Sequence, residues 1–336
     1  MRYYLSTDKR KRTLSDWPSV TITGLVCLLC WVSGYFSSVG FPIAAGDALL
    51  PFWKYIGEWL SHRVLAYFIG FLLIILIAFI LQRISDIEML IRDRTRLVFL
   101  FFFFLASTNV GLLSFNATTL VLLCLVFLIF ELFNTYQLPE ATGKLFNVGV
   151  LISMAGLLMP QVLWLIPLIW IGMYQFQSLS YRSFMASLTG VLIIYWFVLA
   201  WCVWTHDFSM FTSLYTSLAD FNFFSLFVSF RYYHIGFIVL VILLLAAFFY
   251  IKMDAINNRV RVRQMLSFLL NMSFWLLILI CLYGGDTDAL LAVLTLPVSV
   301  LLAYFFESMR TRFRFFLYFL LLALSVFSFF IRIWIF

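Results

Sequence analysis

Hydrophobic positions recur in long, uninterrupted runs along this chain, and the short segments between them hold nearly all of the charges. A run of about 18 or more apolar residues is long enough for a helix to cross the hydrocarbon core of a bilayer, which is about 30 Å thick. Such runs cover 20–40, 64–81, 117–133, 183–204, 235–251, 264–283 and 289–306, and further runs begin at 97 and 315. The pattern predicts an all-α integral membrane protein that forms a single transmembrane domain over 1–336.

One stretch, 146–178, contains two apolar runs but is too short for two full membrane crossings. Two apolar runs meet there at Pro160 and together provide 33 residues. Two full crossings need about 40 residues at 1.5 Å per residue. Two alternatives follow: a pair of short, tilted spans, or a pair that reaches only part of the way across and is shielded by neighbouring helices. Counting both runs, we expect about 11 transmembrane helices.

The segment 41–63 has the pattern of a helix that lies flat on a membrane surface. From Pro51 onward, a helix would gather apolar side chains on one face and polar ones on the other. The apolar face would hold Phe52, Tyr55, Ile56, Trp59 and Leu60, and the polar face Lys54, Glu58 and His62. A second apolar loop, 206–234, would bury Asp220 if it spanned the membrane, so we also expect it to lie at the interface.

Composition and charge agree with this interpretation. The chain is 65% hydrophobic and 11% charged, with a mean hydropathy of +1.06, which excludes a soluble domain. Counting 206–234 as a loop places 18 of the 22 Lys and Arg residues on one side of the membrane. The positive-inside rule then predicts a basic cytoplasmic tail over 1–19, an inside N-terminus and an outside C-terminus. We expect membrane lipids as partners and no nucleic acid, because the net charge of +7 reflects orientation.

Most candidate chemistry falls on the predicted outer face. Asp47 is a candidate general base, although it can equally cap the helix that follows. Glu58 and His62 are further catalytic candidates, while Lys54, Arg63 and Arg231 are the cations available to hold a phosphate. Asp286 and Asp288 have the Asp-x-Asp spacing that binds a divalent cation, although Gly-Gly-Asp-Thr-Asp is also an ordinary tight turn. The sequence indicates no other cofactor.

Two of these features together resemble a known superfamily. An outer loop with an early acid and a flat helix, followed later by the short pair at 146–178, resembles the GT-C glycosyltransferases that use polyprenyl-phosphate-linked sugars. The resemblance implies that Asp47 is the catalytic base or a metal ligand. The chain departs from the pattern because Asp47 has no paired acid and no large outer domain follows. The central part, about 75–205, more closely resembles an uncharacterised bacterial family of multi-spanning inner-membrane proteins.

Two functions therefore stand as hypotheses. The first is a glycosyltransferase of the bacterial cytoplasmic membrane that works on its outer face with a polyprenyl-linked sugar. The second is a non-catalytic membrane subunit or scaffold that binds other membrane proteins of a larger envelope complex. The first requires the outer acids for turnover, whereas the second tolerates their substitution.

Overall fold

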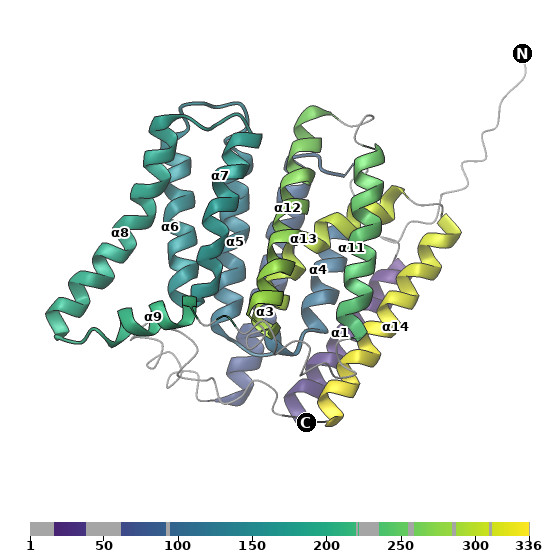
Figure 1. The fold of residues 1–336 in the computed structure, drawn as a ribbon. Helices are drawn as coiled ribbons and strands as arrows, with labels where there is room; N and C mark the ends of the chain where they lie inside the picture. The colour runs from purple at the N-terminus through teal and green to yellow at the C-terminus, as the bar shows by residue number, and fades with distance from the viewer. Residues whose placement is uncertain are drawn as a thin grey trace, which may run out of the picture.

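The computed structural model describes 17–37, 62–91, 95–219, 221, 235–254, 259–283, 287–308 and 311–335, and within these residues all regular structure is helical (Figure 1). The long helices are α1 (Trp17–Phe36), α3 (Arg63–Ile87), α8 (Tyr181–Thr205), α11 (Ile235–Asp254), α12 (Val260–Leu282), α13 (Thr287–Ser308) and α14 (Thr311–Ile335). The shorter helices are α4 (Leu97–Ser107), α5 (Ala117–Phe133), α6 (Thr142–Leu158), α7 (Ile166–Gln175) and α9 (Ser209–Ala219). Two 3₁₀ helices, η1 (Val110–Leu112) and η2 (Pro160–Leu165), interrupt the series.

The described helices confirm a membrane protein. Six of them are long and apolar enough to cross a bilayer: α1, α3, α8, α12, α13 and α14. Shorter apolar helices accompany these six in α4, α5, α6 and the apolar part of α11. The total of eleven spans and the orientation stay predictions, because helix length and composition do not decide them.

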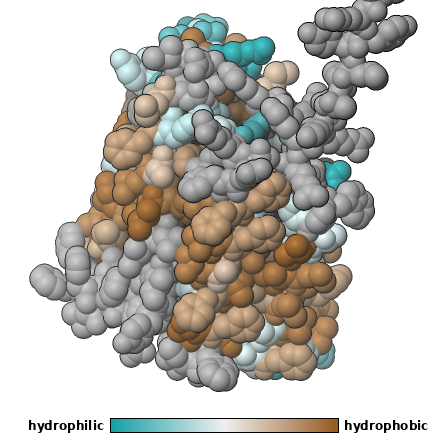
Figure 2. Space-filling model, turned by 90° about the vertical axis from the view of Figure 1, so that its right-hand side faces the viewer, coloured by the Kyte–Doolittle hydropathy of each residue, from teal (hydrophilic) through white to brown (hydrophobic). Residues whose placement is uncertain are grey.

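Most helices run side by side and their ends gather at two levels. We call the level where α3 begins the Arg63 end, at the bottom of Figure 1, and the level where α3 ends the Glu88 end, at the top. On the face shown in Figure 2, hydrophobic side chains cover the middle and hydrophilic side chains gather at the top. This distribution is the one that a lipid-embedded bundle requires, since apolar surface can face hydrocarbon without loss.

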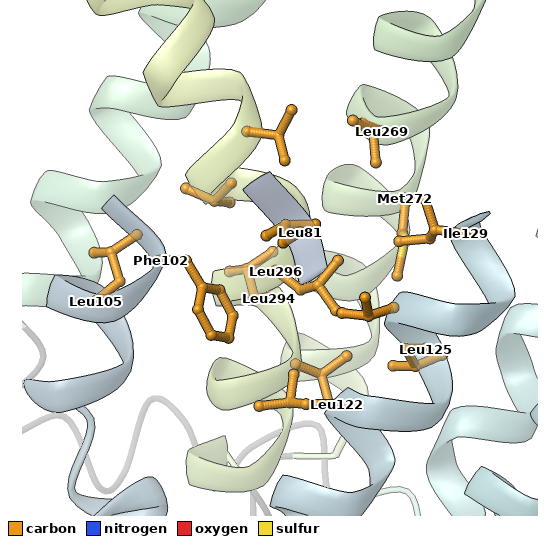
Figure 3. Packing of buried hydrophobic residues seen from close by; sticks show 14 of the residues in the cluster. Leu81, Phe102, Leu105, Leu122, Leu125, Ile129, Leu269, Met272, Leu294 and Leu296 are labelled. Carbon is orange, nitrogen blue, oxygen red and sulfur yellow. The ribbon is translucent and has the colours of Figure 1, made fainter. Parts of the chain in front are cut away.

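The core is organised around α13, the most buried of the six long apolar helices. Leu294 and Leu296 of α13 lie among side chains from other helices of the bundle (Figure 3). These neighbours include Phe102 of α4, Leu125 of α5 and Met272 of α12, all of which are buried. A helix with apolar residues on every side is expected in this central position, where it contacts protein all round.

The helix that was predicted from 97 is short in the structure and closes at Ser107. Helix α4 has only 11 residues, about 16 Å at 1.5 Å per residue, which is roughly half of the hydrocarbon thickness. It starts at the Glu88 end and stops at Ser107, after which the Thr108 hydroxyl donates to the Phe104 carbonyl at 3.2 Å. Ten of its 11 residues are buried, so protein rather than lipid surrounds it. The polar residues from Ser107 to Gly111 indicated in the sequence that this helix closes here, and the structure adds that it does so inside the bundle.

The pair at 146–178 is also shorter than two full crossings. Helix α6 has 17 residues, about 25 Å, and α7 has ten, about 15 Å, with η2 between them. Pro160 begins η2, as expected of a residue whose missing N–H costs nothing in a first turn. Helix α7 is about half as long as the membrane is thick. The pair therefore fits either prediction, two short tilted spans or a pair that reaches only part of the way across.

The described part of the 206–234 loop contains α9, whose 11 residues are too few to cross a bilayer. His206 ends α8 in the left-handed region at a φ of 53°. The Ser209 N–H then donates to the Asp207 carboxylate at 2.9 Å, and this backbone hydrogen bond lowers the pKa of Asp207. The chain therefore turns sharply between α8 and α9, as Figure 1 shows.

Candidate functional site

The residues predicted to form an outer site divide into two groups. Asp47, Lys54, Glu58, Arg231 and Asp286 lie outside the described residues, so the structure does not test their roles. His62, Arg63 and Asp288 are described, and all three lie at the Arg63 end. The geometry of this end is therefore built from these three residues and from the helix ends around them.

One turn, 109–116, joins three helix ends at this level. A methyl group on Gly111 would lie 3.6 Å from the Asp288 Cβ, so the turn is in contact with the start of α13. The Phe115 N–H donates to the Ala66 carbonyl of α3 at 3.2 Å. A methyl group on Gly34 of α1 would come within 2.7 Å of the Leu113 side chain. The turn thus places α1, α3 and α13 around one point.

This turn is polar and holds itself together. The Asn116 side chain donates to the Gly111 carbonyl at 2.9 Å, and the Ser114 hydroxyl donates to the Asn116 side-chain oxygen at 3.0 Å. The Gly111 N–H donates to the Asn109 side-chain oxygen at 3.0 Å. Non-helical backbone at membrane depth is tolerated where protein shields it or where it lines a water-filled cavity. A self-satisfied polar turn at the end of a short buried helix meets this condition.

Arg63 is the most distinctive side chain at this end. Its guanidinium carbon lies 4.5 Å from the centroid of the Tyr35 ring, a cation–π contact between α3 and α1. Its Nε and one Nη are buried, and neither has a hydrogen-bond partner among the described residues. An arginine stays charged in a protein and offers five N–H donors. The two buried nitrogens carry three of these five N–H donors, which are held in place and ready for an acceptor.

Aromatic packing fixes the surroundings of Arg63. The Tyr35 and Tyr67 rings meet edge to face at 5.5 Å, and the Tyr67 hydroxyl donates to the Gly34 carbonyl at 3.1 Å. Deeper along the same helices, the Trp31 indole donates to the Ser107 hydroxyl at 3.2 Å. These contacts hold α1, α3 and α4 together, so Arg63 stands on a rigid support.

His62 is exposed and lies directly before α3. Its carbonyl accepts the N–H groups of Leu65 and Ala66, whereas its side chain makes no capping hydrogen bond. The imidazole is therefore accessible beside Arg63, which is compatible with the predicted acid–base role but does not establish it.

The predicted metal pair is only half described. Asp288 lies in the first turn of α13, where a carboxylate is favoured by the helix dipole. Within the described residues, no group of three or more His, Cys, Asp or Glu side chains is arranged to hold a metal ion. Asp288 thus has a structural role at the helix start, and the Asp286–Asp288 metal site stays a prediction.

The sequence analysis missed a second set of contacts at the same end. The Trp164 indole of η2 donates to the Tyr283 hydroxyl at 2.7 Å, and that hydroxyl donates to the Leu218 carbonyl of α9 at 2.6 Å. The Trp275 indole of α12 donates to the Trp164 carbonyl at 2.7 Å. Interfacial aromatic residues carry a polar atom that requires a partner, which was the available signal. These bonds fix α9 against η2 and the end of α12.

Comparison with known proteins gives a family but no activity. A family of unknown function (DUF6427) matches residues 42–336, which is most of the chain. No curated protein matches the chain. No solved structure matches it either.

Proposed function

We propose that this chain, which belongs to the DUF6427 family of unknown function, is a membrane-embedded transferase that binds a polyprenyl-phosphate-linked sugar at the Arg63 end. The observation that carries the proposal is the Arg63 guanidinium, which is stacked on Tyr35 and keeps two buried nitrogens without a hydrogen-bond partner among the described residues. An anionic acceptor is the ligand that such a group requires.

A lipid-linked phosphate fits this guanidinium. The planar fork of an arginine can hold two phosphate oxygens at once, and Tyr35 keeps the plane in one orientation. A phosphate attached to an isoprenoid chain would keep its tail in the hydrocarbon layer while its charge reaches the helix ends. During sugar transfer the departing lipid phosphate gains negative charge, and a fixed guanidinium stabilises that charge.

The remaining roles are assigned to residues of the two predicted outer segments, 41–63 and 206–234. Asp47 would remove a proton from the acceptor hydroxyl, with Glu58 or His62 as the other candidate for this step. Lys54 and Arg231 would add positive charge around the phosphate. The proposal includes an outward-facing site in the bacterial cytoplasmic membrane, as the distribution of Lys and Arg predicts.

The test is turnover of a radiolabelled polyprenyl-phosphate sugar by the purified full chain in liposomes. We expect Arg63→Ala and Asp47→Asn to abolish transfer, and Arg63→Lys to retain only a small part of it, because a lysine cannot bind two oxygens in one plane. Arg182→Ala is the matched control: Arg182 is exposed at the opposite end, where it lies 3.9 Å from Glu140. Equal turnover in wild type and Arg63→Ala would refute the proposed role of Arg63.

The alternative function makes a different prediction in the same preparations. A non-catalytic subunit would show no turnover in wild type and would co-purify with a membrane protein at fixed stoichiometry. Substitution of Asp47 or Arg63 would then leave this complex intact.

A further inference from the structure

A buried carboxylate lies at the opposite end of the bundle, far along α3 from Arg63. Glu88 directly follows the last residue of α3, and its side chain is only 1% exposed. Its Oε2 lies 2.5 Å from an Nη atom of Arg261 near the start of α12, whose side chain is 47% exposed. This ion pair joins two helices that are distant in sequence, and only one of its two members can reach solvent.

The backbone holds Glu88 inward at a cost. The Leu90 N–H donates to the Ser85 carbonyl at 3.0 Å, which closes the end of α3. The closure places Met89 in the left-handed region at a φ of 51°, which costs a non-glycine residue about 1–2 kcal/mol. Strain of this kind persists only where other contacts enforce it.

The ion pair is poorly supplemented by hydrogen bonds. Arg261 supports the Glu88 carboxylate by its charge and by a side-chain hydrogen bond, and neither oxygen has a further well-aligned hydrogen bond among the described residues. The hydroxyls of Ser85 and Thr95 and the side-chain oxygen of Gln264 are likewise buried without such a bond. A buried ion pair offsets its desolvation only when further hydrogen bonds support it. Burial of Glu88 therefore works against its charged state, and Arg261 is needed to offset that burial.

The charges around Glu88 act in opposite directions. Burial raises the pKa of Glu88, while the positive charges of Arg261 and Lys144 lower it, and the net direction is upward. Lys144 of α6 also donates to the Asn134 carbonyl at 2.9 Å. Arg261 also lies near the Tyr136 ring, at 5.6 Å from its centroid.

Other charged groups of the described residues lie at the same end. On α3, Asp86 accepts from the Gln82 side chain at 2.8 Å. Arg259 contacts the Met89 sulfur at 3.9 Å, and Arg263 is exposed. Arg96 before α4 is exposed, and Glu131 lies in the last turn of α5. Among the residues that the structure describes, Arg261 is thus the cation in direct contact with the Glu88 carboxylate.

Helix α12 is held at both ends. Arg261 ties its start to the end of α3, and Trp275 and Tyr283 tie its other end to η2 and α9. Tyr283 also lies a few residues before Asp288, which contacts the turn 109–116. A displacement of α12 at the Glu88 end would therefore also act on the contacts that α12 makes at the Arg63 end.

We propose that the Glu88–Arg261 pair is a proton-controlled latch between α3 and α12. When the Glu88 carboxylate takes one proton from solvent, it becomes neutral and the ion pair is lost. Arg261 keeps its charge and moves fully into solvent, which it already touches, while the neutral Glu88 side chain stays buried, and the start of α12 moves away from the end of α3. This inference is independent of the proposed transferase activity.

The experiment measures the distance between spin labels at Ile87 of α3 and Val260 of α12, both exposed, in the full chain in nanodiscs. Cys124 and Cys281, the two cysteines that are not buried, are replaced by serine beforehand. We expect the distance to increase as the pH falls from about 8 to about 4, a range that brackets a carboxyl group with a raised pKa.

Variants distinguish the latch from a general acid effect. Glu88→Gln and Arg261→Gln should each give the longer distance at every pH, since either change removes the ion pair. Asp86→Asn is the matched control and should respond to pH as the wild type does, because Asp86 bonds to Gln82 instead. A wild-type distance that does not change with pH overturns the latch, and so does a wild-type pH response in Glu88→Gln or Arg261→Gln.

Discussion

Gly149 of α6 lies directly against Gly190 of α8, so closely that a methyl group on Gly149 would come within 3.1 Å of the Gly190 Cα. The same methyl group would overlap the Ser187 carbonyl oxygen, and one on Gly190 would overlap the Phe146 carbonyl oxygen. Small residues allow membrane helices to approach this closely. In lipid the hydrophobic effect does not drive helices together, so their association depends on such close packing.

Gly149→Ala should therefore push α6 and α8 apart. We expect a loss of about 1–3 kcal/mol in the free energy of unfolding, the usual range for overpacking, measured by chemical denaturation in detergent. Gly143→Ala is the control on the same helix, because nothing lies within 4 Å of its added methyl group. That variant should be neutral or slightly more stable, and a similar loss in both would contradict the close crossing.

Tyr283→Phe should release α9 from the bundle. The variant removes the hydroxyl that donates to the Leu218 carbonyl and accepts from the Trp164 indole, at a cost of about 1 kcal/mol per hydrogen bond. Hydrogen exchange of 209–219 should become faster while exchange in α13 is unchanged. Tyr215→Phe, at a residue of α9 that is 73% exposed, should leave the exchange rates as they are.

Met89→Gly should stabilise the protein, contrary to the usual effect of glycine. Met89 has a positive φ, which glycine adopts without strain, so we expect a gain of about 1 kcal/mol. Met253→Gly provides the opposite sign, because Met253 lies within α11, where glycine costs about 1 kcal/mol. Thermal unfolding of the two variants in detergent measures both changes, and a loss in Met89→Gly would show that its conformation is not strained.

Arg261→Met should make stability more dependent on pH. Burial raises the pKa of Glu88 in the folded protein, and Arg261 counteracts this rise. A carboxyl group whose pKa is raised in the folded state contributes to the stability of that state. The contribution is fully present below the unfolded pKa and is lost as the pH rises through the folded pKa. Arg261→Met raises that folded pKa further. Its unfolding temperature should therefore fall, between about pH 4 and about pH 8, more than that of the wild type.

The double variant Glu88→Gln/Arg261→Met is the control for this prediction. It has no carboxyl group at 88, so the additional pH dependence should disappear. Its persistence would assign the effect to another titrating group.

Several features followed from local pattern alone. The long apolar runs predicted helices of membrane-spanning length, and α8, α12 and α13 cover the expected stretches. The helical ends were less predictable. Helix α3 continues to Ile87, past the charged residues at 83 and 86. It can do so because a helix forms its backbone hydrogen bonds whether or not its side chains are apolar. Helix α4 stops at Ser107 because the chain turns there onto α3 and α13.

The candidate site was located only in part. Arg63 was chosen from the sequence for its charge and position, and its stacking on Tyr35 required the packing of α1 against α3. Glu88 was not chosen at all, because a carboxylate in an arginine-rich connector has the same local pattern whether it is solvated or buried. Its partner Arg261 follows more than 170 residues later in the sequence.

The sequence by itself determined that this is a helical membrane protein, because hydrophobicity and length act within one segment and need no partner. It also identified Arg63 as a cation at a helix start. Only the tertiary structure decided that the turn 109–116 joins α1, α3 and α13, and that Glu88 is sealed from solvent beside Arg261. Burial, cation–π contact and ion pairing depend on distances between residues that are remote in the chain, and local pattern carries no information about those distances.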